Sequence, residues 1–295
     1  MTCRCLLAVL IVGFLMPRLA EAADDVFDSK GVKIRYVSEG KGEPVVLIHG
    51  WMGDAGMWGR LDTNPATKEY QLIALDCRGH GKSDKPHDAD KYGVAMADDV
   101  VRLLDHLKLE KAHLIGYSSG AFIAGKVAAT HPHRVLSVVY AGQAPLVTKP
   151  KSDTVEKPSG PNEVEVFAKA VEEGKGLGAY IKAVSPGGDK LTDEQADKIA
   201  KVLYGGKDVK AFALAGMSFG DLEVSEEQLK KCKAPLLFVH GAKESDIVKN
   251  HVARVHKQLG RGEVKLIEGG DHITTLGKPE FGTVLNEFLK ANKSK

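Results

Sequence analysis

An apolar run that ends at a serine set between two glycines constrains the fold more than any other stretch of the sequence. Residues 112–116 suit a buried parallel strand, and residues 121–130 suit a helix. The residues between them complete the stretch Gly116-Tyr117-Ser118-Ser119-Gly120. Glycines favour a sharp strand-to-helix turn, because the helix must pack closely on the adjacent strand. The stretch therefore predicts a turn that projects the Ser118 hydroxyl from the end of a sheet.

The same five-residue pattern also arises by chance in a chain that contains 32 glycines. A functional interpretation of Ser118 therefore requires partner side chains elsewhere in the sequence. The helix that follows supplies one favourable feature, because the free N–H groups and the dipole at its first turn stabilise negative charge.

Strands and helices alternate over most of the chain. Such alternation is typical of a parallel sheet covered on both faces, so the pattern predicts an α/β fold with a doubly wound, mostly parallel sheet. The expected strands are Val26–Asp28, Val32–Ser38, Pro44–Ile48, Tyr70–Leu75, 112–116, Val135–Tyr140, Pro235–His240 and Glu263–Ile267. The expected helices of this core are Ala95–Leu107, Ala121–Thr130, Val248–Leu259 and Pro279–Ala291.

Between Gln143 and about Lys233 the strands cease, and prolines near the start of this segment mark a linker. Helical patterns follow at Glu163–Glu173, Asp193–Leu203 and Lys207–Met217. Two sequences match the capping box that opens a helix, Thr192 with Gln195 and Ser225 with Gln228. We therefore expect a helical cap at residues 143–233, inserted into a core made of residues 23–142 and 234–295. The large apolar side chains of this segment are expected to pack the cap's own core rather than to line a pocket; they are Phe167, Tyr180, Phe212, Met217 and Phe219.

The first 22 residues have the composition of a secretory signal peptide. Arg4 provides a positive start, Cys5 to Met16 is apolar, and Ala20-Glu21-Ala22 fits a cleavage site. A membrane anchor is the alternative, but the apolar run is about a dozen residues and a spanning helix needs about 20. We expect residues 1–22 to be removed and the protein to be exported to the periplasm or beyond, without a stable membrane anchor.

Charge and cysteine content exclude some classes of protein. The formal charge of +2 becomes +1 after loss of two arginines and one glutamate in the leader, and lysines and acids are interspersed, so nucleic-acid binding is not expected. Only Cys77 and Cys232 remain in the mature chain, where an oxidising compartment would allow a disulfide. The predicted topology places the two at opposite ends of strands, so we expect two unpaired thiols.

Two loops follow expected strands and are rich in glycine and polar residues. His49-Gly50-Trp51-Met52-Gly53 can aim backbone N–H groups into a crevice, although, taken alone, an ordinary strand-to-helix loop with a buried tryptophan is the better explanation. The second loop spans Asp76 to Asp84. Within it we expect an ion pair between Asp76 and Arg78, and a histidine, His80, that braces the loop.

Three chemically suggestive segments follow expected strands at their carboxyl ends, where parallel sheets bind ligands. Ser118 follows the fifth strand, Glu244 and Asp246 follow the seventh, and His272 follows the eighth. A serine hydroxyl is a weak nucleophile unless an imidazole takes its proton, and a carboxylate must orient that imidazole. The chain order of serine, acid and histidine is one of those in which this machinery occurs.

With these motifs the chain resembles the α/β-hydrolase superfamily over Val26 to Ala291. The resemblance rests on His49-Gly50-Trp51, on Asp76-Cys77-Arg78-Gly79-His80-Gly81-Lys82-Ser83, on the serine turn and on the late histidine. It implies that Ser118 is the nucleophile and His272 the general base. It further implies an oxyanion hole formed by the backbone N–H groups of Trp51 and Ser119, a substrate pocket shaped by the cap, and no requirement for a cofactor or metal.

The acid departs from the family pattern of Gly-x-x-Asp followed by apolar residues. Here the segment is Gly241-Ala242-Lys243-Glu244-Ser245-Asp246-Ile247-Val248. The spacing from Gly241 favours Glu244, and the position before the apolar pair favours Asp246. We prefer Glu244, whose longer side chain can still reach an imidazole. Asp271, beside the base, is a remote third candidate.

The serine excludes related enzymes that use an aspartate nucleophile, such as haloalkane dehalogenases and epoxide hydrolases. The expected activity is hydrolysis of a small-molecule carboxylic ester or lactone through an acyl-enzyme. Carbon–carbon bond hydrolases and cofactor-free haloperoxidase-like enzymes have the same triad and stay open as alternatives. A ligand-binding or sensing protein built on the same scaffold is an alternative of a different class.

Overall fold

The computed structural model describes residues 23–61, 64–149, 162–185 and 188–294. Within this part of the chain an eight-stranded sheet has the order β1-β2-β4-β3-β5-β6-β7-β8. The first two strands pair antiparallel, β2 also pairs antiparallel with β4, and the remaining neighbours are parallel. The strands are β1 Ala23–Asp28, β2 Lys33–Glu39, β3 Glu43–Ile48, β4 Tyr70–Leu75, β5 Ala112–Tyr117, β6 Val135–Ala141, β7 Leu236–Gly241 and β8 Glu263–Ile267. The predicted α/β class with a mostly parallel sheet is confirmed.

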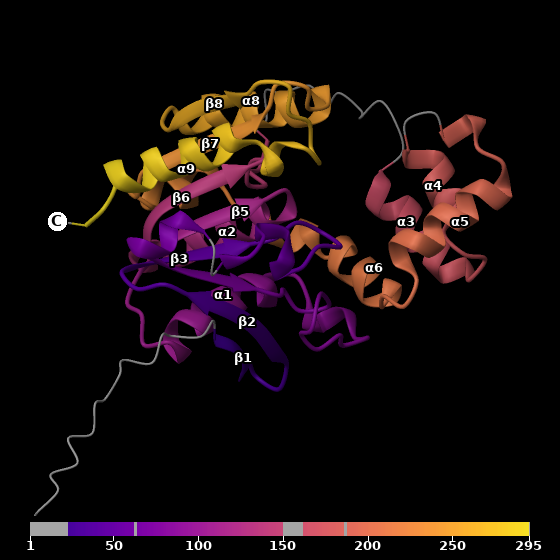
Figure 1. Cartoon of the computed structure of the whole chain (residues 1–295), viewed down its shortest axis with the longest axis horizontal. Helices are drawn as coiled ribbons and strands as arrows, with labels where there is room; N and C mark the ends of the chain where they lie inside the picture. Colours follow the sequence, from indigo (N-terminus) through magenta and orange to yellow (C-terminus); the bar gives the residue numbers. More distant parts are fainter. Residues whose placement is uncertain (1–22, 62–63, 150–161, 186–187, 295) are drawn as a thin grey trace, which may run out of the picture.

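Helices cover both faces of this sheet (Figure 1). On one face, α1 (Val94–His106), α2 (Ser119–Thr130), α7 (Glu226–Lys231) and α8 (Asp246–Leu259) share an apolar core with the strands. On the other face, α9 (Pro279–Ala291) packs through Phe281 and Leu289. Because both faces are covered, every residue of β5 and β7 is buried, which explains the continuous apolar runs in the sequence.

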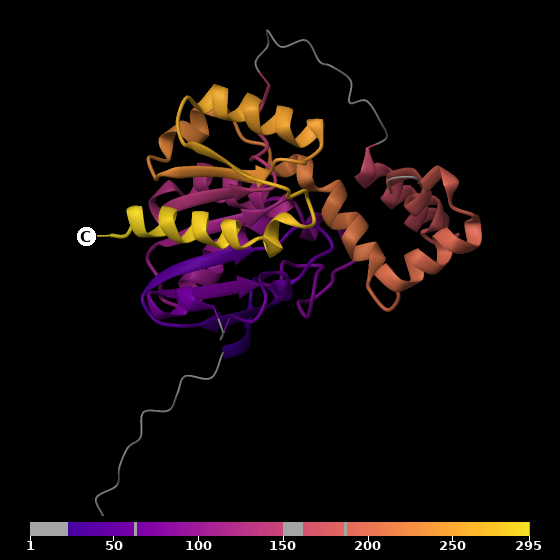
Figure 2. The same ribbon diagram turned by 45° about the horizontal axis from the view of Figure 1, so that its top comes forward.

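Of the five α-helices that the structure describes between β6 and β7, the first four form a group that we call the cap helices. They are α3 (Glu163–Glu173), α4 (Gly178–Val184), α5 (Asp193–Tyr204) and α6 (Val209–Met217). Helices α3 to α5 stand away from the sheet, and α6 runs between them and the α/β core (Figures 1 and 2). Both predicted capping boxes are formed, at the start of α5 and of α7. The short helix α4 is absent from the predicted elements, because it has seven residues and starts at a glycine.

The cap helices have a small apolar core of their own. Phe167, Tyr180 and Phe212 are buried in it, as expected from the sequence. Two of the five predicted core residues lie elsewhere. Met217 is 57% exposed, and Phe219 packs against the core beneath the cap and against Phe122.

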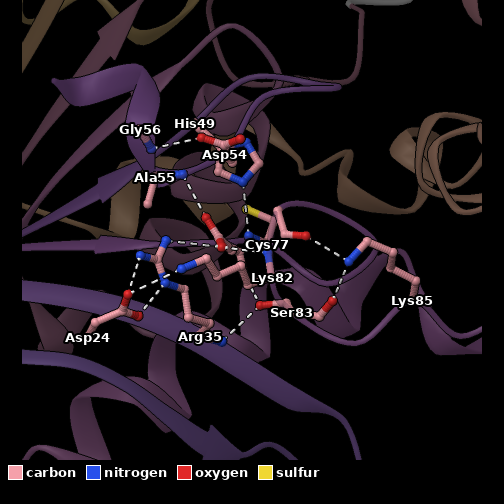
Figure 3. A network of polar contacts seen from close by, with 12 residues as sticks. Asp24, Arg35, His49, Asp54, Ala55, Gly56, Cys77, Lys82, Ser83 and Lys85 are labelled. Carbon is pink, nitrogen blue, oxygen red and sulfur yellow. Dashed lines mark hydrogen bonds and ion pairs between the residues drawn. The ribbon is translucent and has the colours of Figure 1, made fainter. Parts of the chain in front are cut away.

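The predicted ion pair between Asp76 and Arg78 is wrong. Arg78 pairs with Asp99 of α1 at 2.6 Å, and both side chains are buried. Asp76 instead accepts from Arg35 of β2 at 3.2 Å. The same guanidinium pairs with Asp24 at 2.6 Å (Figure 3). The reason is that Asp76 and Arg78 face opposite sides of the sheet: the N–H of Ala55, which packs on the α9 side, donates to Asp76, whereas α1 covers the other side.

Cys77 and Cys232 are both buried free thiols, as expected. Burial raises the pKa of the Cys77 thiol and of the Cys232 thiol, so both stay protonated at neutral pH. The predicted leader, residues 1–22, lies outside the described residues. None of the helices that the structure describes is long and apolar enough to cross a bilayer.

The buried pair of Arg78 and Asp99 gives a matched test with its neighbour Asp98. Asp99→Asn leaves a buried guanidinium without its counter-charge, so the free energy of unfolding should fall by about 3–5 kcal/mol. Asp98 pairs with Arg102 near the surface, so Asp98→Asn should change stability by about 1 kcal/mol or less. Urea unfolding of both variants measures the difference. Equal losses would contradict the assigned pairing.

Candidate active site

Ser118 occupies a strained turn between β5 and α2. Its backbone angles are φ 53° and ψ −121°, a region that a non-glycine residue adopts only when the surroundings enforce it. The flanking glycines allow this geometry. A Cβ at Gly116 would overlap the carbonyl oxygen of Gly120, and a Cβ at Gly120 would overlap that of Ile48 in β3. The turn is therefore held by close backbone packing, with the Ser118 side chain only partly buried.

The structure brings Ser118, His272 and Glu244 into one hydrogen-bonded row. Ser118 Oγ lies 2.9 Å from His272 Nε2, and His272 Nδ1 lies 3.0 Å from Glu244 Oε1. With the Nδ1 proton donated to the carboxylate, Nε2 is left as the acceptor for the Ser118 hydroxyl proton. The three side chains come from the carboxyl ends of β5, β7 and β8, so the parallel sheet is what gathers them.

The two carboxylates of the acid segment have different surroundings. The Glu244 side chain is 1% exposed and faces His272, whereas the Asp246 side chain is 90% exposed and pairs with Lys249 at 3.0 Å. The cause is a helix cap. Ser245 caps α8, so Asp246 is the first residue of that helix and points to solvent. Of the two predicted candidates, only Glu244 contacts the imidazole.

Asp271 has a structural task beside the base. Its Oδ1 accepts from the N–H groups of Ile273 and Thr274 and from the Thr274 hydroxyl. These bonds to Thr274 and Ile273 hold the pKa of the Asp271 carboxyl below its ordinary value. The carboxylate is thus used to shape the turn that carries His272.

Sequence reasoning missed two residues that fix the position of His272. The Tyr117 hydroxyl donates to the His272 carbonyl at 2.8 Å, and the Thr275 hydroxyl donates to the Asp271 carbonyl at 2.6 Å. Burial raises the pKa of Tyr117, so its phenol stays a donor. Tyr117 precedes the nucleophile, so this bond joins the serine turn directly to the loop of the base. Only its place inside the five-residue motif could have drawn notice to it.

The turn at Gly50 and Trp51 lies against the nucleophile. A Cβ at Gly50 would approach Ser118 Cβ to 3.1 Å. The N–H of Ser119 belongs to the first residue of α2, where helix N–H groups have no partner within the helix. Among the described residues, neither this N–H nor that of Trp51 donates to another backbone carbonyl outside regular elements. The turn that precedes Trp51 and the first residue of α2 thus both adjoin Ser118, and the oxyanion role of the two N–H groups stays a prediction.

Two buried histidines brace the surrounding loops. His49 Nδ1 donates to the Gly50 carbonyl at 2.7 Å, and its Nε2 accepts from the Cys77 N–H at 2.9 Å. His80 Nδ1 donates to the Arg78 carbonyl at 3.0 Å, which fits the predicted bracing role. Burial lowers the pKa of His49 and lowers that of His80 to about 3, so both rings are neutral. No group of three or more His, Cys, Asp or Glu residues suited to a metal ion occurs in the described part of the chain.

This sheet topology, the inserted cap and the row of serine, histidine and carboxylate define a class of α/β enzymes. The family model for the alpha/beta hydrolase fold matches residues 43–279. The chain belongs to that family and is a hydrolase in the broad sense of the fold.

Known proteins similar to this chain carry varied chemistries. A putative 2-succinyl-6-hydroxy-2,4-cyclohexadiene-1-carboxylate synthase of Bacillus subtilis is 27% identical over 271 residues, which are 88% of this chain and 96% of that protein. Non-heme chloroperoxidase CPO-A1 of Kitasatospora aureofaciens is 30% identical over 283 residues, with 88% and 96% covered. Among solved structures, one from work on carboxylesterases of Nitrososphaera gargenis has a similar fold, with a TM-score of 0.71 at 22% identity. The match covers 90% of this chain and 98% of that one.

The identity of the acid can be tested with a pair of nearly isosteric changes. Glu244→Gln should lower the rate at which Ser118 reacts with a fluorophosphonate by roughly 10³–10⁴-fold, because the imidazole loses the carboxylate that fixes its tautomer. Asp246→Asn should leave the rate within about twofold, because that carboxylate is solvated. A large loss in Asp246→Asn with little loss in Glu244→Gln would overturn the assignment.

The Tyr117 hydroxyl can be removed without changing the ring. Tyr117→Phe should lower the same labelling rate by about tenfold, the loss of about 1.4 kcal/mol that one hydrogen bond supplies. Thr283→Val is a suitable control, because the Thr283 hydroxyl bonds only within α9. Should Tyr117→Phe react at the wild-type rate, the bond to His272 has no positioning role.

Proposed function

We propose that this protein hydrolyses carboxylic esters or lactones of small molecules through an acyl-enzyme formed on Ser118. The observation that carries the proposal is the row of contacts from Ser118 Oγ to His272 Nε2 at 2.9 Å and from His272 Nδ1 to Glu244 at 3.0 Å. This spacing allows the imidazole to take the serine proton while the carboxylate stabilises the imidazolium.

The proposed reaction has two halves. Ser118 Oγ attacks the ester carbonyl and passes its proton to His272, and the tetrahedral oxyanion accepts from the N–H groups of Trp51 and Ser119. The imidazolium then protonates the leaving alcohol oxygen, and the C–O bond breaks. Water, deprotonated by His272, attacks the acyl-enzyme, and collapse releases the carboxylic acid and restores the Ser118 hydroxyl.

The fold favours the charged intermediate. Ser118 stands at the N-terminus of α2, where unpaired N–H groups and the helix dipole stabilise negative charge. One oxyanion donor typically lowers the barrier by about 2.7–4 kcal/mol. Among the described residues, the hydrogen bonds to the buried Glu244 carboxylate all come from the His272 imidazole.

The names of similar proteins support a second candidate function. A 2-hydroxymuconate semialdehyde hydrolase, 35% identical over 39% of this chain, and a non-heme chloroperoxidase are among them, so carbon–carbon bond cleavage or haloperoxidase-like chemistry is the alternative for the same three side chains. A ligand-binding protein on this scaffold is the alternative outside catalysis. Turnover assays separate these functions. Hydrolysis of esters, cleavage of vinylogous diketones and formation of a peracid distinguish the three enzyme activities, and tight binding of a ligand without turnover identifies a binding protein.

We also propose that residues 1–22 are removed during export and that residues 143–233 act as a cap over the site. The leader composition supports the first, and the cap helices between β6 and β7 support the second. N-terminal sequencing of the protein recovered from an exported fraction tests the cleavage, which is expected before Ala23.

The ester proposal is tested with purified mature protein and a series of p-nitrophenyl esters of increasing acyl length. We expect saturable hydrolysis of at least one ester, and a fluorophosphonate should label wild type at Ser118 and leave Ser118→Ala unlabelled. Ser118→Ala should lose at least about 10³-fold in turnover, because the covalent route is closed. Equal turnover by wild type and Ser118→Ala would contradict the mechanism.

A further inference from the structure

Trp51 belongs to two parts of the molecule at once. Its backbone lies in the turn beside Ser118, but its side chain reaches into the cap helices. The indole Nε1–H donates to the Phe212 carbonyl of α6 at 2.8 Å. The indole also meets Phe167 of α3 edge to face, with ring centroids 5.2 Å apart and planes at 77°.

The cap is shaped to receive this indole. A Cβ at Gly216 of α6 would stand 2.9 Å from Cζ2 of Trp51 and 2.8 Å from Cγ1 of Val164 in α3. Both distances are shorter than real Cβ contacts, so glycine at this position leaves the space that the indole fills. Because close-packed protein interiors have low compressibility and transmit strain, a shift of α6 or α3 is expected to move the indole.

The other side of the same turn is anchored to the α/β core. His49 donates to the Gly50 carbonyl at 2.7 Å, and the Gly53 N–H donates to the same oxygen at 3.0 Å. The His80 ring packs on His49 with centroids 5.1 Å apart and on Phe212 with centroids 4.9 Å apart. Trp51 is therefore connected on one side to a braced loop of the core, through Gly50, and on the other side to the cap helices, through its indole.

Helix α6 has further contacts to the core that do not involve Trp51. At its N-terminus Asp208 pairs with His87 at 2.9 Å, and at its C-terminus the Ser218 hydroxyl accepts from the Gly93 N–H at 3.0 Å. Neither contact involves the indole, so we expect α6 to stay docked when the indole bond is removed. The link through Trp51 can thus be changed separately from the docking of the cap.

We propose that the Trp51 indole is a positioning group that couples the placement of α6 and α3 to the oxyanion hole. When the cap helices hold the indole, the backbone N–H of Trp51 is held toward the oxyanion formed on Ser118. A shift of the cap withdraws that donor. The coupling rests on the proposed function, and it assigns to the cap an effect on the rate of acylation in addition to any effect on substrate binding.

Trp51→Phe and Trp58→Phe form a matched pair for the test. Trp51→Phe keeps an aromatic ring and loses the N–H that bonds Phe212. Trp58 has a buried Nε1 without a hydrogen-bond partner in the described residues. Trp58→Phe therefore removes an indole N–H without breaking a hydrogen bond. We expect Trp51→Phe to lower kcat for an ester by about tenfold or more, toward the roughly 10²–10³-fold that loss of an oxyanion donor causes. KM should change by less than about threefold, and Trp58→Phe should leave both constants unchanged.

A double-mutant cycle with Gly216→Ala tests the coupling to the cap itself. Gly216→Ala crowds the indole from the cap side, so it should lower kcat in wild type and have little further effect in Trp51→Phe. Multiplicative losses in the double variant would overturn the proposal. If urea unfolding shows that Gly216→Ala is not folded, Phe167→Leu replaces it in the cycle. This variant weakens the contact of the indole with α3, and the same non-additivity is expected.

The outcomes separate this proposal from the proposed function. A wild-type protein that neither hydrolyses esters nor reacts with a fluorophosphonate refutes the ester mechanism. An active wild type with an equally active Trp51→Phe refutes the coupling alone. The pH–rate profile adds a check, because loss of an oxyanion donor lowers the rate at every pH and leaves the shape of the profile unchanged.

Discussion

The close backbone packing around Ser118 is the constraint on which the rest of the site depends. A serine at φ 53° is strained, and it stays there because Gly116 and Gly120 let α2 approach β5 and β3 without a Cβ between them. That approach aims the N-terminus of α2 and the Gly50 turn at the same hydroxyl. One packing arrangement therefore determines the positions of the nucleophile, of the N-terminus of α2 and of the Gly50 turn.

The parallel sheet brings the other two side chains of the hydrogen-bonded row to Ser118. His272 and Glu244 lie on loops after β8 and β7, far from Ser118 in the sequence, and they meet it because parallel strands end at a common edge. The loop of the base is then locked by Tyr117, Thr275 and the turn around Asp271. Precise placement of an imidazole matters because small displacements of a catalytic group lower rates steeply.

Much of this architecture follows from sequence patterns, and the reason is physical. Buried parallel strands must be largely apolar, so β3, β4, β5, β6 and β7 are recognisable, and a serine between glycines marks the turn. The preference for Glu244 over Asp246 rests on the spacing from Gly241 and on the reach of the longer side chain, and the Ser245 cap explains why the second carboxylate turns away. Side-chain partners across the sheet are less predictable. Asp76 and Arg78 are neighbours in sequence but face different layers, and the bonds made by Tyr117 and the Trp51 indole join segments 155 and 161 residues apart.

The central claim is that the reaction passes through a covalent ester of Ser118. The most direct measurement is acid quenching of the protein during turnover of a slowly hydrolysed ester, followed by digestion and mass spectrometry of the peptide that contains Ser118. The account predicts that this peptide gains the mass of the acyl group and that the gain disappears once substrate is exhausted. Steady turnover with an unmodified Ser118 peptide, or with the acyl group on another residue, would contradict it.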